Sequence, residues 1–155
     1  MKEKVLLPLD GSEVGEAAIP NVVDVITRFN PDEIEITLLH VISQFSYSAL
    51  SESVNTEFAL NGDQLQELKQ QANEYLQKVA TRIRKRGITV NIMVTVGHPA
   101  EEIIRVSQEL GVNLIAMSTH GRSGIGRWAL GSVTDKVLHH SSIPVVTVRS
   151  KLKKA

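Results

Sequence analysis

Two polar segments of the chain carry the residue types that bind a negatively charged group. One is Asp10-Gly11-Ser12, and the other is residues 118–135, which include four glycines at 121, 124, 126 and 131. Glycine lets backbone N–H groups approach an anion closely. A helix that begins near Ser132 would add unpaired N–H groups and the positive end of its dipole. The second segment is therefore a candidate phosphate site.

The same segment also has a purely structural interpretation. Glycines that follow a strand are often turn residues, and Ser132 with Asp135 three positions later is typical of a capping box. The segment is not a Walker loop, because Gly-Lys-Ser/Thr is absent, and its glycines do not have the spacing of a dinucleotide fingerprint. It also lacks the Gly-x-Ser-x-Gly elbow of a hydrolase nucleophile. The residues alone leave both interpretations open.

The elements that must position these segments alternate along the chain. Short apolar runs predict buried strands, and the amphipathic stretches between them predict helices. The expected strands span residues 5–9, 34–42, 88–96, 114–117 and 143–148, and the expected helices span 12–29, 63–86, 99 onward and 132–140. This alternation predicts an α/β fold, with one open parallel sheet and helices on both faces. Ligands of such sheets bind beyond the carboxyl ends of the strands, where both polar segments would lie.

The composition argues against several classes of function. The 155 residues include 17 Lys+Arg and 17 Asp+Glu, and a net charge of zero argues against nucleic acid or an anionic membrane as a partner. The chain has no cysteine, which excludes disulfides, thiolate metal sites and cysteine nucleophiles. No run approaches the roughly 18 apolar residues of a membrane span. We therefore expect a cytoplasmic protein.

The chain resembles the universal stress protein family over essentially its whole length. The resemblance rests on residues 8–12, 38–42, 96–99 and 118–132. The ATP-binding subgroup of that family has a Gly, two residues, a Gly, nine residues and then Gly-Ser/Thr. Gly121 and the pair Gly131-Ser132 fit this spacing, whereas Ser118 replaces the first glycine.

The resemblance implies both a fold and a ligand site. The fold is a Rossmann-like five-stranded sheet in the order 3-2-1-4-5, with a single nucleotide-binding domain over residues 1–150 and a basic tail over 151–155. The ligand is ATP, which the family often pairs with a divalent cation such as Mg²⁺ or Mn²⁺. The implied contacts are Asp10 and the backbone of Val41 for adenine, Pro8, Met117 and Ser118 for the base and ribose, and Gly121, Gly131, Ser132, Val133 and Thr134 for the phosphates.

Three functions follow from these observations. The leading hypothesis is an ATP-binding stress-response protein that acts as a nucleotide-dependent regulatory or signalling module, with little or slow ATP hydrolysis. The second is a nucleotide-free homodimeric adaptor or chaperone-like stress protein, in which the glycine segment is structural. The third is a weak ATPase, although the chain shows no Walker lysine and no paired carboxylates near the glycines.

The fifth expected strand, residues 143–148, would form an edge of the sheet. An exposed apolar edge invites pairing with another chain. The resemblance implies a homodimer joined through this strand, and the alternative is that the C-terminal tail shields the edge.

Other residues with chemical potential are interpreted as structural. His40 lies inside a predicted strand, and His120 is expected to orient the glycine segment. The basic residues at 82–86 are typical of a solvated helix end. Residues 43–62 form a long connection, which either packs on its own domain or forms a lid or partner surface.

Overall fold

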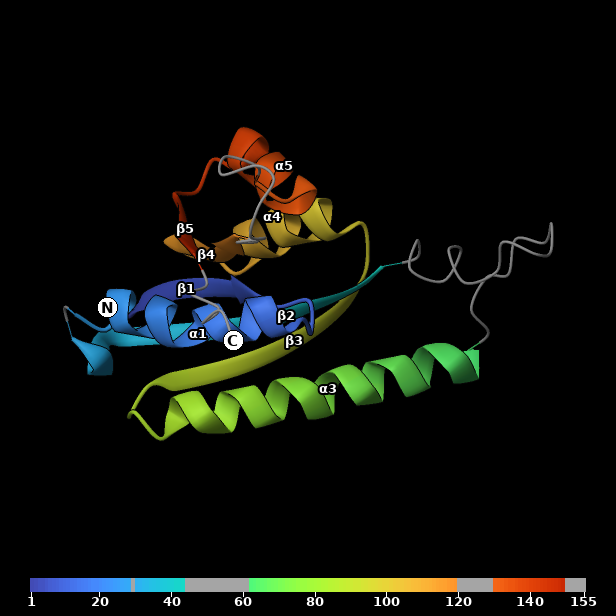
Figure 1. The fold of residues 1–155 in the computed structure, drawn as a ribbon, viewed down its shortest axis with the longest axis horizontal. Helices are drawn as coiled ribbons and strands as arrows, with labels where there is room; N and C mark the ends of the chain where they lie inside the picture. Colours follow the sequence, from blue (N-terminus) through green and yellow to red (C-terminus); the bar gives the residue numbers. More distant parts are fainter. Residues whose placement is uncertain (29, 44–61, 120–129, 150–155) are drawn as a thin grey trace, which may run out of the picture.

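Five parallel strands form the central sheet of the computed structural model, which describes residues 1–28, 30–43, 62–119 and 130–149. The strands are β1 (Glu3–Pro8), β2 (Ile34–Ser43), β3 (Thr89–Gly97), β4 (Leu114–Thr119) and β5 (Val145–Arg149). Their order is β3-β2-β1-β4-β5, and every neighbouring pair is parallel (Figure 1). The predicted strand order and the α/β class are confirmed.

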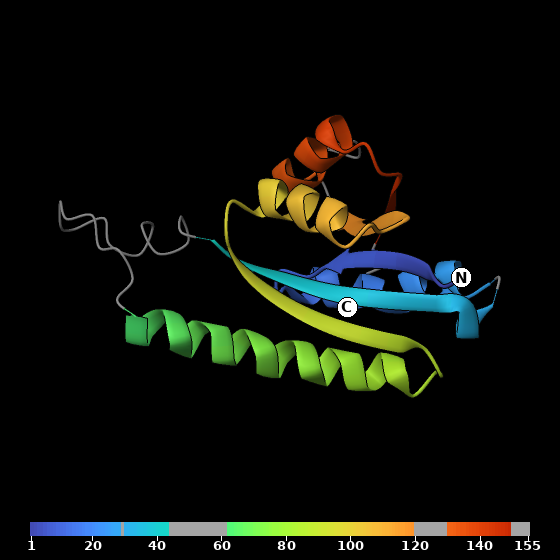
Figure 2. The same ribbon diagram turned by 180° about the vertical axis from the view of Figure 1, so that it is seen from behind.

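Helices cover both faces of the sheet. α1 (Glu13–Ile26) and α3 (Gly62–Arg84) lie on one face, and α4 (Pro99–Glu109) and α5 (Ser132–His140) lie on the other (Figure 1, Figure 2). A short 3-10 helix, η1 (Pro31–Glu33), precedes β2. Every expected strand and helix is present, and the observed bounds are within about three residues of those expected.

Successive side chains of the central strands point to opposite faces of the sheet and pack in two separate apolar cores. In β1, Leu7 faces α1 and α3, whereas Leu6 faces α4 and α5, and both side chains are buried. Leu38 and Leu39 of β2 divide between the two cores in the same way. Because helices cover both faces, these strands are apolar without alternation, as is usual for central parallel strands.

Strand β5 is an edge of the sheet, as predicted, but it begins two residues later than expected. Pro144 has no N–H to donate to a ladder, although its carbonyl oxygen accepts a hydrogen bond from the N–H of Ile115 at 2.9 Å. Regular pairing with β4 therefore starts at Val145. The valines of β5 are half-buried, so an apolar edge strand is present where the sequence predicted one.

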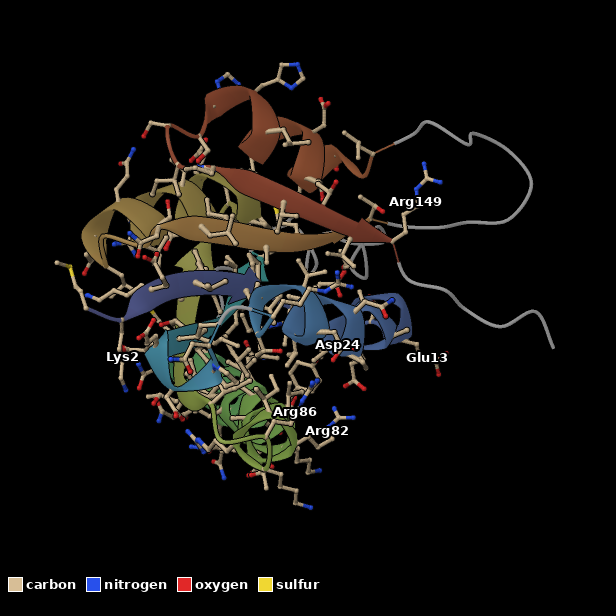
Figure 3. The ribbon with its side chains drawn as sticks, turned by 90° about the vertical axis from the view of Figure 1, so that its left-hand side faces the viewer. Lys2, Glu13, Asp24, Arg82, Arg86 and Arg149 are labelled. Atoms are coloured by element: carbon tan, nitrogen blue, oxygen red, sulfur yellow. The ribbon has the colours of Figure 1, made fainter. Side chains whose placement is uncertain are left out.

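Two ion pairs join the C-terminal end of α3, and the turn that follows it, to α1. The guanidinium of Arg82 lies 3.5 Å from the carboxylate of Glu16, and that of Arg86 lies 2.7 Å from Asp24. Figure 3 shows Arg82 and Arg86 extending from the α3 side toward Asp24. Both arginines are solvent-exposed, as predicted for the basic cluster. They also form ion pairs with carboxylates of α1.

Several expectations concern residues outside the described ranges. They include Gly121 and His120 of the glycine segment, most of the long connection 43–62, and the basic tail 151–155. Within the described ranges, no helix is both long and apolar enough to cross a membrane.

Candidate functional site

A cavity of about 260 Å³ lies at the carboxyl ends of β1, β2 and β4, on the face covered by α4 and α5. The chain leaves β1 toward β2 on one side and reaches β4 on the other, so this is the point at which the strand order reverses. Open α/β sheets bind ligands at such points. The volume is slightly below the roughly 300 Å³ at which pockets for drug-sized molecules begin. The described residues therefore enclose a small ligand or one part of a larger one.

Nine of the ten predicted site residues line this cavity, and the tenth, Gly121, lies outside the described residues. The nine are Pro8, Asp10, Val41, Met117, Ser118, Gly131, Ser132, Val133 and Thr134. They come from β1, β2, β4 and α5, which are far apart in the sequence. The structure thus brings together both polar segments. Their contacts with a ligand stay a prediction.

Four further residues, which the sequence analysis did not single out, also line the cavity: Leu9, Leu39, Pro99 and Ile103. Leu39 lies two positions before Val41, and alternation along a strand places the two on the same face. Pro99 belongs to the motif at 96–99, which carried the family resemblance, and it begins α4. These two signals were present in the sequence, whereas the position of Ile103 follows from the packing of α4.

The start of α5 differs from the predicted capping box. Gly131, not Ser132, is the N-cap residue, and Ser132 is the first residue of the helix. The carbonyl oxygen of Gly131 accepts the N–H of Asp135 at 2.9 Å, which closes the first helical turn. Because glycine has no side chain, the N-cap residue supplies no side-chain cap, and the N–H groups of residues 132–134 precede the first intrahelical bond. The prediction that Ser132 caps α5 is therefore wrong, and the helix start faces the cavity with its amides uncapped by Gly131.

Asp10 is placed at the rim of the cavity by the turn between β1 and α1. Its Oδ1 accepts a hydrogen bond from the N–H of Ser12 at 2.9 Å, and Oγ of Ser12 accepts one from the N–H of Gly15 at 3.1 Å. Gly11 adopts a φ of +82°, a left-handed conformation that favours glycine. Asp10, Ser12 and the first turn of α1 thus form one hydrogen-bonded unit, in which Ser12 is the N-cap of α1.

The side chain of Ser118 is directed toward α1. Its Oγ lies 3.8 Å from the position that a Cβ atom would take on Gly15. The preceding residue of β4, Met117, packs in the core under α4 and α5, and side chains alternate along a strand. The serine that replaces the family's first glycine therefore has room under α1 for its extra atoms.

The motif at 96–99 leads into α4, and its Pro99 lines the cavity. Gly97 has a φ of +154°, and a Cβ there would lie 3.0 Å from Cγ of Glu102. The hydrogen bond from Arg105 holds the pKa of Glu102 below its usual value, against the opposing effect of burial. The carboxylate of Glu102 is thus committed to an ion pair with Arg105 at 2.9 Å, so it is a structural group and not a proton donor to the cavity.

The described residues contain no group of three or more histidines, aspartates or glutamates placed to hold a metal ion. A divalent cation at this site would depend on ligand oxygens and water, which are the groups that Mg²⁺ keeps in nucleotide sites.

A model of the universal stress protein family matches residues 1–149. The chain belongs to this family. It is 30% identical to universal stress protein MJ0577 of Methanocaldococcus jannaschii, over 97% of each chain, and 28% identical to universal stress protein YxiE of Bacillus subtilis, over 96% of this chain and 100% of the other.

Solved structures show the same fold. The structure of MJ0577 superposes with a TM-score of 0.76 at 28% identity and covers 99% of each chain. That of the protein PH0823 superposes with a TM-score of 0.73, also at 28% identity, and covers 100% of each chain. The predicted family and the Rossmann-like fold are therefore confirmed.

Proposed function

We propose that this universal stress protein binds ATP in the cavity and acts as a nucleotide-dependent regulatory module in a stress response. The observation that carries the proposal is the lining of the cavity, which combines Asp10 with the N-terminus of α5. A carboxylate accepts hydrogen bonds from an amino group, and an uncapped helix start donates hydrogen bonds to phosphate oxygens. The two groups therefore suit the base and the phosphates of a nucleotide.

Other lining residues fit the rest of the nucleotide. Val41, Met117 and Pro8 offer apolar surface against which a flat base would pack. Ser132 and Thr134 belong to the first turn of α5, and their hydroxyl groups add two donors beside the amides of that turn. Bound ATP would thus be held by packing at the base and by hydrogen bonds at the phosphates.

Two solved members of the family support an adenine nucleotide as the class of ligand. One is an Arabidopsis thaliana protein with AMP bound, with a TM-score of 0.67 at 16% identity. The other is a universal stress protein in complex with cAMP, with a TM-score of 0.62 at 18% identity. At these identities the likeness shows the shared fold alone, so the choice of ATP for this chain rests on its own residues.

Little or slow hydrolysis is part of the proposal. Among the described residues that line the cavity, Asp10 is the only carboxylate, and there is no lysine. Efficient phosphoryl transfer needs groups that position the attacking water and stabilise the transferred phosphate. Mg²⁺ or Mn²⁺ would enter bound to the phosphates and would neutralise their charge. A cytoplasmic location belongs to the same proposal, because that compartment supplies ATP.

Calorimetry and extraction test this proposal. We expect heat on adding Mg-ATP to the purified protein, or adenine nucleotide in the supernatant after the protein is boiled and the supernatant is run on an ion-exchange column. Gly131→Val should abolish binding, because its branched side chain would fill the phosphate space. Gly62→Val is the matched control, since Gly62 also begins a helix but has open space around its Cβ position. Absence of both nucleotide and heat in the wild-type protein would reject ATP binding.

A homodimeric adaptor is the second candidate, and the apolar edge of β5 favours it. In this version a second copy of the chain pairs along residues 143–148, and the protein binds its partners without a nucleotide. A dimer whose partner binding is indifferent to ATP and to Gly131→Val would support the adaptor. A dimer that needs ATP would support the regulatory module.

A further inference from the structure

We propose that His40 is a positioning residue for the nucleotide, which holds the end of β1 so that the backbone of Val41 and the carboxylate of Asp10 both face the base. The proposal rests on the proposed function of the cavity. It starts from an irregular hydrogen bond at the point where β1 leaves the sheet.

The two backbone groups of Leu9 have different kinds of partner. The N–H of Leu9 donates to the carbonyl oxygen of Leu39 at 2.8 Å, which is an ordinary bond of the β1–β2 ladder. The carbonyl oxygen of Leu9 lies 2.8 Å from Nδ1 of His40, a side-chain atom. Because a carbonyl oxygen only accepts, Nδ1 of His40 must carry the hydrogen.

The histidine takes the place of a backbone amide. In a regular parallel ladder, the carbonyl of Leu9 would accept the N–H of Val41, two residues beyond Leu39. That bond is missing from the backbone hydrogen bonds of the described residues, and the paired register of β1 and β2 ends at Pro8 and Leu39. The imidazole of His40 therefore ends the ladder and leaves the Val41 amide without its usual partner, at the wall of the cavity.

The imidazole of His40 is itself held in place by a contact with α3, which covers the face of the sheet opposite to the cavity. Its ring meets the ring of Tyr75 edge to face, with centroids 6.3 Å apart and planes at 72°. Such an arrangement is a favourable one for aromatic pairs. Tyr75 belongs to α3, so the packing of α3 on the sheet determines which way Nδ1 of His40 points.

The resulting arrangement has the chemistry to select a base. A backbone N–H at Val41 and a carboxylate at Asp10 offer one donor and one acceptor among the residues that line the cavity. Adenine presents an amino donor next to a ring-nitrogen acceptor, whereas guanine has a carbonyl oxygen in place of that amino group. A guanine oxygen would meet the carboxylate of Asp10 unfavourably. His40 is thus expected to contribute to the preference for adenine without touching the base.

Four proteins test this role by calorimetry with ATP, GTP and inorganic tripolyphosphate. His40→Leu removes the Nδ1 donor, and we expect it to weaken ATP binding about tenfold and to reduce the preference for ATP over GTP. Tripolyphosphate affinity should not change, because the start of α5 is intact. His40→Asn offers an amide nitrogen near the position of Nδ1 and should restore ATP affinity. His139→Leu is the control, because Nδ1 of His139 makes the same kind of bond to a carbonyl, that of Asp135 at 2.8 Å, away from the cavity.

Amide hydrogen exchange in the ligand-free protein tests the structural step separately. In His40→Leu the N–H of Val41 should take over the carbonyl of Leu9 and exchange about tenfold more slowly than in the wild-type protein. Wild-type protein that binds no ATP would reject the proposed function. If the wild-type protein binds ATP, two results would reject the role of His40 alone. In one, His40→Leu binds ATP as well as the wild-type protein does; in the other, it loses affinity for ATP and for tripolyphosphate in the same proportion.

Discussion

The backbone of Gly15 packs directly against the carboxylate of Asp10. A Cβ atom on Gly15 would lie 3.2 Å from Oδ1 of Asp10 and 3.4 Å from Oγ of Ser12. The first distance is shorter than an ordinary contact between carbon and oxygen, so a side chain at this position would move the carboxylate. The start of α1 therefore sets where Asp10 lies at the rim of the cavity.

Gly15→Ala should weaken nucleotide binding while it leaves the stability of the protein nearly unchanged. Alanine favours a helix over glycine by up to about 1 kcal/mol, so the free energy of unfolding in urea should stay within about 1 kcal/mol of the wild-type value. The added methyl group displaces Oδ1 of Asp10, and ATP binding measured by calorimetry should weaken severalfold.

Gly62→Ala is the control for this substitution, because its Cβ would meet nothing within 4 Å. It should leave ATP affinity unchanged. Equal affinities of Gly15→Ala and wild-type protein would show that the carboxylate of Asp10 is not a contact of the nucleotide.

Most of the fold could be predicted from the sequence because its elements are strongly patterned. The runs that became β2 and β4 are apolar on both faces, and α3 has a clear apolar stripe that includes Leu76 and Val79. These patterns define strands and helices but not the order of strands. That order came from the family resemblance, because no local signal states which strands are neighbours.

The candidate site was predictable where it depends on the types of residue in the segments between a strand and the next helix. Asp10 lies in such a segment, and Ser132 lies at the end of another. Two features were not predictable. The cap of α5 lies one residue earlier than the capping-box pattern indicates, because Gly131 adopts the extended conformation of an N-cap, with a φ of −60° and a ψ of 152°. The bond from His40 to Leu9 depends on the spacing of two strands, which a sequence pattern does not contain.

Tyr75 should make stability depend on pH in the alkaline range. Burial, followed by the nearby charges of Glu16 and Asp10, raises the pKa of Tyr75 from 10.0 to about 12. The folded state thus holds the proton more tightly than the unfolded state. The contribution to stability is complete below pH 10 and is lost as the pH rises from 10 to about 12.

The measurement is urea unfolding of wild-type protein and Tyr75→Phe across this range. The difference between their free energies of unfolding should change by about 1–2 kcal/mol, a value discounted for the solvent screening of a half-buried group. Phenylalanine has no proton to lose, so the contributions of all other groups cancel in the comparison. Parallel curves for the two proteins would contradict the raised pKa.

The ion pair between Arg86 and Asp24 should contribute little to stability despite its length of 2.7 Å. The side chains are 46% and 56% exposed, and exposed pairs contribute about 0–1 kcal/mol. Asp24→Asn should therefore lower the free energy of unfolding by less than about 1 kcal/mol, and less at high salt. Leu76→Ala, at a fully buried position of α3, should cost about 2–5 kcal/mol. Similar losses in the two variants would show that the ion pair contributes more to stability than its exposure indicates.

A charge on the outer strand should separate the two copies of the proposed homodimer. Thr147 of β5 is exposed, and in Thr147→Lys two lysines would approach each other across paired edges, which opposes pairing. Sedimentation should give about twice the 17.0 kDa mass of one chain for wild-type protein and a shift toward the single chain for the variant. Asn91→Lys places the same charge on β3, at the other edge of the sheet. There the lysine would lie near the carboxylate of Glu35, which now accepts a hydrogen bond from Asn91 at 2.7 Å. This control should remain dimeric, and its dissociation in place of Thr147→Lys would assign the interface to β3.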